Sequence, residues 1–152
     1  MTDIRQDMIE PLYQAVQQTR PLLRHITGAV EAGLDETGLT VGLRAILEGL
    51  LLTGEASLPE LTARLQLKRQ FVHKMLGEGQ EKSLVEALPH PRRKNGHHYR
   101  LSPQGRNLIE EIRARELRAM ATFAQGFSSR EIAAFIRVQA ALNGFFRDMA
   151  GR

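Results

Sequence analysis

Cysteine is absent from the 152-residue sequence, and its absence excludes several kinds of chemistry. Without a thiol there can be no disulfide bond, no thiolate catalysis, no cysteine-ligated zinc and no cysteine-based redox sensing. Long apolar runs are also absent, because the longest, residues 45–52, is interrupted by Glu48 and is too short to span a bilayer. The opening MTDIRQDMIEPLYQ lacks the apolar core of a signal peptide. We therefore expect a cytoplasmic protein with no membrane partner.

Motifs for catalysis are missing as well. The sequence has no glycine-rich phosphate loop, no recognisable carboxylate pair and no Ser/His/Asp signature, and Ser57, Ser102 and Ser128 are better explained as helix caps. Five histidines raise the question of a metal site, but no HxxxH spacing occurs, and the neighbours His97 and His98 would point to opposite faces of a strand. We predict that the protein is not an enzyme and has no catalytic residue, cofactor or metal ligand.

Acidic residues are missing from one stretch, HPRRKNGHHYRLSPQG, which runs from His90 to Gly105. It holds four lysines and arginines and three histidines. The wider segment 68–100 carries eight lysines and arginines against three acids, a net charge of +5, whereas the rest of the chain has a net charge of −1. Such a localised charge is the footprint of a polyanion-binding face. The alternative is a solvated charged face without a partner.

Apolar residues at helical spacing dominate the first third of the chain. One set predicts an amphipathic helix that Pro11 kinks or delays, and a second set follows Pro21, which suits an early helical position. The two sets are Ile4, Met8, Leu12 and Val16, and then Leu22, Leu23, Ile26 and Val30. We expect two helices or one kinked helix up to about Ala32. The linker AGLDETGLT and the N-cap Thr40 then lead into an apolar helix that Gly54 ends.

The segment SLPELTARLQLKRQFVHKML predicts a helix-turn-helix. Ser57 and Glu60 form a capping box at the start of a short helix. A second apolar stripe begins after Gln66, so the connection is a tight turn and a second helix follows. Apart from its apolar stripe, that second helix carries basic and polar side chains, as the recognition helix of a helix-turn-helix does.

Two short strands, LVEAL at 84–88 and HHYRL at 97–101, follow the second helix. Asn95-Gly96 lies between them and predicts a hairpin, because both residues tolerate positive φ. Ser102-Pro103 then begins a long helix, and a second capping box at Ser128 opens a last helix with a Phe-rich stripe, which is either core or a dimer seam. The acid-free stretch is therefore the tip and return strand of a wing.

In this order of elements the chain resembles the MarR family of bacterial transcriptional regulators over essentially its whole length. The resemblance rests on GLT before the helix-turn-helix, on the two wing strands, on LSPQGR at the start of the long helix and on the flanking helical segments. It differs from the family at the wing tip RRKNG, which has no acid, at Lys68 in place of a Ser or Thr cap, and at Ser83 in place of glycine. The resemblance implies a homodimer with interlocking terminal helices, two winged lobes on a pseudo-palindromic operator, and small ligands that release the DNA.

The fold class that follows is mainly α (α+β), a winged helix-turn-helix with flanking N- and C-terminal dimerisation helices. Residues 1–36 are expected to form the N-terminal dimerisation helices and residues 37–102 the winged helix-turn-helix lobe. Residues 103–152 are expected to form the long helix and the C-terminal dimerisation helix.

The function that we predict is sequence-specific binding of double-stranded DNA by a homodimeric transcriptional regulator, a repressor, with a small-molecule effector. Residues on the second helix are expected to reach base edges and those of the wing tip to reach phosphates or a minor groove. The predicted DNA-binding residues are Lys68, Arg69, Gln70, His73, Lys74, Arg92, Arg93 and Lys94. Arg64 and Arg100 are phosphate contacts or plain surface, and no effector-binding residue is assigned. His25 could lie near the family's effector pocket, although a histidine with no such role is the commoner case. The alternative function is a winged-helix protein-interaction module without specific DNA binding.

Overall fold

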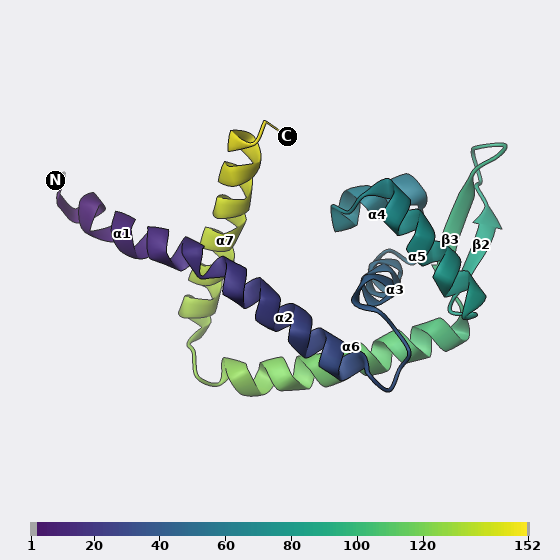
Figure 1. Cartoon of the computed structure of the whole chain (residues 1–152), viewed down its shortest axis with the longest axis horizontal. Helices are drawn as coiled ribbons and strands as arrows, with labels where there is room; N and C mark the ends of the chain where they lie inside the picture. The colour runs from purple at the N-terminus through teal and green to yellow at the C-terminus, as the bar shows by residue number, and fades with distance from the viewer. Residues whose placement is uncertain (1–2, 152) are drawn as a thin grey trace. The chain divides into compact units, whose positions relative to one another are not determined.

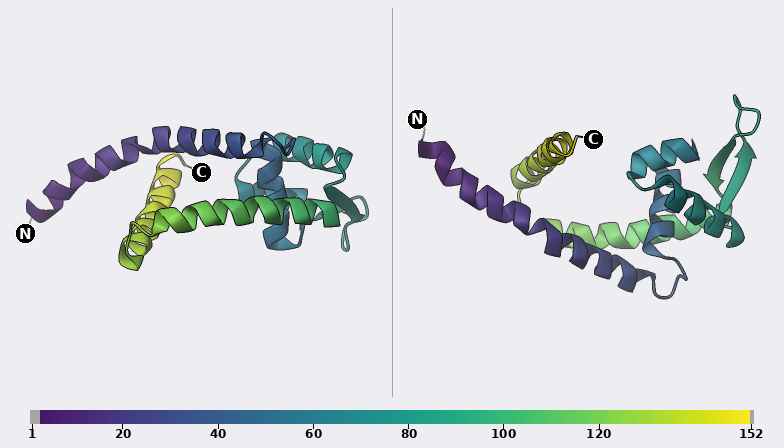
Figure 2. Two further views of the ribbon diagram at one scale, coloured as in Figure 1. Left: turned by 90° about the horizontal axis from the view of Figure 1, so that it is seen from below. Right: turned by 45° about the horizontal axis from the view of Figure 1, so that its top comes forward.

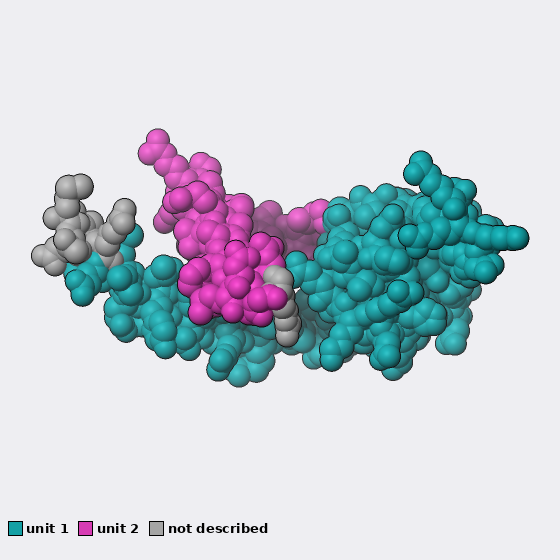
Figure 3. Space-filling model, turned by 90° about the horizontal axis from the view of Figure 1, so that it is seen from above, with its two compact units in different colours: residues 1–109 teal, residues 110–152 magenta. Residues whose placement is uncertain are grey.

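The computed structural model describes residues 3–151 and consists of helices with one small sheet (Figure 1). The elements in chain order are α1 (Asp3–Gln17), α2 (Thr19–Leu34), α3 (Val41–Thr53), β1 (Glu55–Ser57), α4 (Leu58–Leu65), α5 (Arg69–Glu81), β2 (Val85–Pro89), β3 (His97–Leu101), α6 (Pro103–Ala124) and α7 (Ser129–Met149). The chain forms two compact units that divide after Ile109, within α6 (Figure 3). The winged helix-turn-helix expected from the sequence is present in the first unit.

The N-terminal helices α1 and α2 follow one another with almost no break, as the views in Figure 2 show. The amide of Gln18 at the junction donates to the carbonyls of Gln14 and Ala15, both at 3.2 Å. The structure has two helices here, which is one of the two arrangements expected. Pro11 lies inside α1 and does not interrupt it. The side chain of Ile4, which the sequence placed on the apolar face, lies outside the described part of the chain.

The end of α2 differs from the expectation. The helix continues to Leu34, so the linker begins at Asp35 rather than at Ala32. The amide and the hydroxyl of Thr37 both donate to the carbonyl of Leu34, at 2.8 and 2.7 Å, and this local bonding closes the helix two residues later than the glycine pattern suggested.

The core of the first unit forms around α3. Four of its apolar side chains are completely buried, together with side chains from α4 and α5; they are Leu43, Ile46, Leu47 and Leu50, and Leu61, Val72 and Leu76. The capping residues place the three helices as expected, because Thr40 accepts from the amide of Leu43 at 3.2 Å and Ser57 forms a complete capping box with Glu60. Gln66 makes the turn between α4 and α5 in the left-handed conformation, with φ 52°.

The sheet has three strands in the order β1-β3-β2, all antiparallel. The sequence predicted β2 and β3 but not β1, which pairs Glu55 with Arg100 and Ser57 with His98. A strand of three residues offers no alternating pattern, and its last residue also caps α4, so its local signal is that of a helix start.

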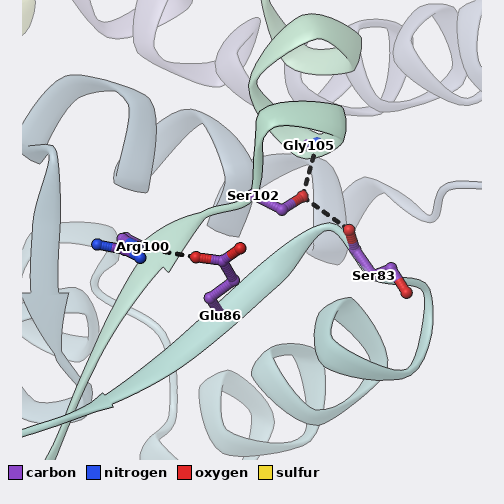
Figure 4. Close-up of polar contacts among 5 residues, drawn as sticks. All are labelled: Ser83, Glu86, Arg100, Ser102 and Gly105. Atoms are coloured by element: carbon purple, nitrogen blue, oxygen red, sulfur yellow. Dashed lines mark hydrogen bonds and ion pairs between the residues drawn. The ribbon is translucent and has the colours of Figure 1, made fainter.

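The wing joins α6 through a set of short polar contacts (Figure 4). Ser102 caps α6, because its hydroxyl accepts from the amide of Gly105 at 3.0 Å and donates to the carbonyl of Ser83 at 2.7 Å. Ser83 has φ 60°, a left-handed conformation that favours glycine, which is the residue usual at this position in the family that the sequence resembles. A Cβ at Gly105 would lie 2.1 Å from the carbonyl oxygen of Leu84. The LSPQG sequence therefore fastens the wing to the helix that follows it.

The hairpin tip is closed by a different mechanism from the one predicted. The expectation of positive φ at Asn95 and Gly96 is wrong, because neither residue is among the left-handed positions of the described chain. Instead, Gly96 donates to the carbonyl of Arg93 at 3.3 Å, and the amide of His90 donates to the carbonyl of Gly96 at 2.9 Å. A Cβ at Gly96 would lie 3.1 Å from that of His90, a tight contact that a small shift of the neighbouring side chain would have to relieve.

The second unit consists of the C-terminal part of α6 and the whole of α7. Ser128 and Glu131 form the predicted capping box, and hydrogen bonds from the Ser128 amide and hydroxyl lower the pKa of the Glu131 carboxyl. No residue of α7 is buried in the single chain. Among residues 3–151, no helix is both long and apolar enough to cross a membrane.

Candidate nucleic-acid interface

The predicted recognition helix, α5, presents its polar residues on one exposed side. Val72, Met75 and Leu76 are buried and fix the helix on the core. The five predicted DNA contacts at this helix, Lys68, Arg69, Gln70, His73 and Lys74, are all exposed. Because positions three and four apart share a helix face, the burial of the apolar stripe leaves these side chains facing solvent. Lys68 is the N-cap residue, and its side chain makes no capping bond.

The wing tip brings the other three predicted contacts together. Arg92, Arg93 and Lys94 are exposed on the loop that projects beyond β2 and β3 (Figure 1). No ion pair between described residues engages any of them, so their charge is uncompensated in the first unit.

Arg100 lies at the base of the wing and has a partner. Its Nε donates to the Glu86 carboxylate at 2.8 Å across the β2–β3 pair (Figure 4). This cross-strand pair is half-exposed, and the carboxylate offsets part of the charge of Arg100. Arg64 is exposed in the last turn of α4.

A histidine cluster lies behind the tip. The ring centroids of His90 and His98 are 4.4 Å apart in an edge-on arrangement, and His98 Nδ1 is 3.6 Å from the Glu55 carboxylate. The Arg92 amide donates to His90 Nδ1 at 3.0 Å. Partial burial lowers the pKa of the His90 imidazole, the positive charges of His98 and Arg93 add to this effect, and Glu60 opposes it.

Glu60 belongs to the same neighbourhood through the α4 capping box. The Ser57 amide donates to its carboxylate at 2.9 Å and lowers the pKa of that carboxyl, with smaller contributions from His98 and His90. Within residues 3–151, no group of three or more histidine, aspartate and glutamate side chains is arranged to hold a metal ion.

A cleft of about 250 Å³ separates α5 from the wing. Its lining residues come from the end of β1, from α4, α5, the wing loop and β3: Ser57, Leu58, Pro59, Arg69, His73, His90, Arg93, Asn95, Gly96, His97 and Tyr99. Sequence reasoning identified Arg69, His73 and Arg93 but not the opposing histidines. The clustering of three histidines within the acid-free stretch was the available signal.

A second, more open cleft of about 710 Å³ lies where the end of α2 and the loop after it meet α3 and α5. Its lining residues are Glu31, Leu34, Asp35, Gly38, Leu39, Thr40, Val41, Gly42, Phe71, Lys74, Met75 and Glu78. Lys74 lines this cleft and not the one beside the wing. His25 is exposed on α2 and lines neither cleft.

A three-helix lobe whose third helix, α5, is basic and is followed by a basic wing defines a winged helix-turn-helix protein. The crystal structure of a MarR family transcription regulator is 48% identical in sequence, with a TM-score of 0.88 over 99% of both chains. The chain belongs to the MarR family of transcription regulators.

More distant structures share the fold. The FabT protein of Streptococcus pneumoniae, solved in complex with DNA, is 18% identical with a TM-score of 0.75 over 90% of this chain and 99% of that one. BpsR of Bordetella bronchiseptica, whose DNA binding is regulated by 6-hydroxynicotinic acid, is 16% identical with a TM-score of 0.72 over 84% and 91%. Neither the protein-family models nor the curated proteins gave a match to the sequence.

Proposed function

We propose that the protein is a homodimeric transcriptional repressor that binds a pseudo-palindromic operator in double-stranded DNA through α5 and the wing. The observation that carries the proposal is the coincidence of two exposed basic surfaces, on α5 and on the wing tip, in the arrangement of a winged helix. Arg69, Gln70 and His73 would reach base edges in the major groove, where arginine can pair with guanine and glutamine with adenine. Arg92 and Arg93 would contact phosphates or an adjacent minor groove.

Dimerisation is part of the proposal because the terminal helices leave large apolar side chains in water. Phe145 is 58% exposed and Met149 is 68% exposed, and α1 and α2 expose a comparable set. That set consists of Met8, Ile9, Leu12, Tyr13, Leu22, Leu23 and Ile26. Apolar surface on this scale usually marks an interface. A second copy covering residues 1–36 and 103–152 is consistent with the pseudo-palindrome, since a two-fold dimer reads two related half-sites.

A small-molecule effector is proposed for the cleft where α2, α3 and α5 meet. Its wall combines apolar side chains such as Phe71 and Met75 with charged groups of both signs, Lys74 and the carboxylates of Glu31, Asp35 and Glu78. Such a mixture suits a small aromatic compound with polar substituents. Because α5 forms part of this wall, an occupant there would affect the recognition helix directly. Thermal-shift screening with small aromatic compounds tests the site, and the absence of any stabilising compound would favour a protein that binds DNA constitutively.

The DNA-binding proposal is tested by separating the wing from the helix. Arg92→Gln with Arg93→Gln should weaken binding to operator and random duplexes by similar factors. The slope of log K against log salt should fall by up to about 2, because each lost phosphate contact removes roughly one unit. Gln70→Ala should instead narrow the difference between operator and random DNA by about 1–3 kcal/mol if a bidentate base contact is lost.

The measurement is a salt titration of fluorescence anisotropy on both duplexes, with the operator first selected from a random pool. Lys82→Gln is the control for loss of a positive charge, because Lys82 is exposed in the winged lobe and is not among the predicted DNA contacts. An unchanged affinity and salt slope in the wing variant would contradict the proposal. A wild-type protein that prefers no sequence would favour the alternative, a winged-helix protein-interaction module.

A further inference from the structure

The cleft between α5 and the wing has an unusual lining for its size. Arg69 and His73 line it from α5, and His90, Arg93 and His97 line it from the wing. None of its lining residues is a carboxylate. An opening of about 250 Å³ lined by two guanidinium groups and three imidazoles offers its donors and charge to an anion.

The geometry of duplex DNA indicates which anion fits. The major and minor grooves are separated by a single sugar–phosphate strand. A protein that puts a helix into one groove and a wing into the next must therefore straddle that strand. The cleft lies between these two elements, so the strand would pass over it and present phosphate groups to both walls.

We propose that this cleft receives a backbone phosphate and takes up protons when it does so, which makes DNA binding tighter as the pH falls from 8 to 6. The inference rests on the proposed DNA binding and adds its regulation by pH. It assigns Arg69 and His73 to the phosphate strand instead of a base edge and leaves Gln70 as the residue of α5 that reads a base. Histidine is the side chain whose charge changes in this range, and the cleft concentrates three of the five in the sequence.

The free protein favours the neutral imidazole at His90. Arg92 donates its amide to His90 Nδ1, which must be unprotonated to accept it. His98 from β3 and Arg92 and Arg93 from the loop oppose a further positive charge at His90, and Glu60 from α4 partly offsets them. His98 itself faces the Glu55 carboxylate of β1.

His73 and His97 lie in the same cationic surroundings. Arg69 on α5, Arg93 on the loop and Tyr99 on β3 share the cleft with them. A phosphate placed among these groups supplies the negative charge that the lining lacks, so each imidazole holds a proton more readily in the complex than in the free protein.

The direction and size of the effect follow from linkage. A ligand that raises the pKa of a group binds more tightly to the protein in which that group is protonated. The affinity therefore rises as the pH falls through the interval between the pKa in the complex and the pKa in the free protein. For an imidazole with an ordinary pKa near 6.5, a rise of about one pH unit gives roughly sixfold tighter binding at pH 6 than at pH 8. Two imidazoles acting together give roughly 40-fold and three give roughly 200-fold.

The experiment uses the full chain and measures duplex affinity by anisotropy between pH 6 and 8.5 at constant ionic strength. Wild type should bind at least about sixfold more tightly at pH 6. The variant His73→Gln, His90→Gln, His97→Gln should lose most of this dependence, whereas His25→Gln, on α2, should keep it. The inference is overturned if the duplex affinity of the wild-type protein does not change with pH, or if the triple variant keeps the same pH dependence of affinity.

A second measurement does not depend on the triple variant folding. The ring protons of the histidines in the wild-type protein are followed by NMR through a pH titration, alone, with inorganic phosphate and with duplex. The cleft histidines should keep their protons to higher pH with duplex than without it, and His25 should not change. A matching effect of inorganic phosphate would identify the free ion as a second source of the bound group, and an effect of duplex alone would assign it to the DNA backbone.

If neither ligand moves the cleft histidines more than His25, the inference is wrong. Duplex binding that persists without proton uptake contradicts only this inference. An absence of duplex binding at every pH contradicts the proposed function as well.

Discussion

Gly105→Ala tests the junction that holds the wing on α6. The added Cβ would lie 2.1 Å from the carbonyl oxygen of Leu84 and 2.9 Å from its carbonyl carbon. These are backbone atoms of the residue just before β2, so a side-chain rotation cannot relieve the contact. The first turn of α6 and the start of β2 must move apart, and the hydrogen bonds between them lengthen.

The magnitude can be built from the contacts at the junction. The Ser102 amide donates to the Leu84 carbonyl at 3.0 Å, and the Ser102 hydroxyl donates to the Ser83 carbonyl at 2.7 Å. Losing the two costs about 2 kcal/mol, and overpacking adds about 1–3 kcal/mol. The better helix propensity of alanine returns up to about 1 kcal/mol. We expect a net loss of about 2–4 kcal/mol in the free energy of unfolding.

The assay is urea unfolding followed by far-UV circular dichroism, repeated at several protein concentrations because a dimer is stabilised by mass action. Gly77→Ala is the matched control, because a Cβ there meets no atom within 4 Å and should raise stability by up to about 1 kcal/mol. Gly79→Ala should be destabilising, since its Cβ would lie 2.7 Å from Cγ2 of Val85. The reasoning fails if Gly105→Ala unfolds within about 0.5 kcal/mol of wild type while Gly77→Ala behaves as expected.

Two further predictions concern the dimer and the helix caps. Removing residues 128–152 should abolish a dimer seen by light scattering, and a wild-type protein that remains monomeric at tens of micromolar would contradict the proposed assembly. Glu60 has a pKa held below its usual value by the Ser57 amide, so its capping contribution is present above about pH 4.5 and is lost as the pH falls through the lowered value. Glu60→Gln should therefore flatten the acid side of the stability profile from urea unfolding, and an unchanged profile would show that the cap carries no charge-dependent stability.

The caps and the apolar spacing were sufficient to predict most of the first unit. Thr40, Ser57 and Ser102 each have a short-range signature, because the group that a cap bonds lies two or three residues along the chain. The burial of Val72 and Leu76 was also predictable, since helical spacing places both on one face.

The features that escaped prediction depend on residues far apart in sequence. β1 exists because Glu55 and Ser57 pair with β3, some 40 residues later. The cleft beside the wing has Arg69 on one wall and His97 on the other. These residues are far apart in the sequence, so no local sequence pattern predicts that they lie near one another. The hairpin shows a subtler case: Asn95-Gly96 predicted the right connection for a wrong reason, because neither residue adopts positive φ and backbone hydrogen bonds of His90 and Gly96 close the tip.

The wing divides stability and binding between its two ends. Its base is fixed by the Ser102 contacts, by the Arg100–Glu86 pair and by buried Tyr99, all of which are satisfied within the first unit. Its tip carries Arg92 and Arg93, whose charges have no partner among the described residues, so they contribute little to the folded state. Because a polyanion would supply the missing partner, substitutions at the tip should change affinity with little effect on unfolding, whereas substitutions at the base should change both.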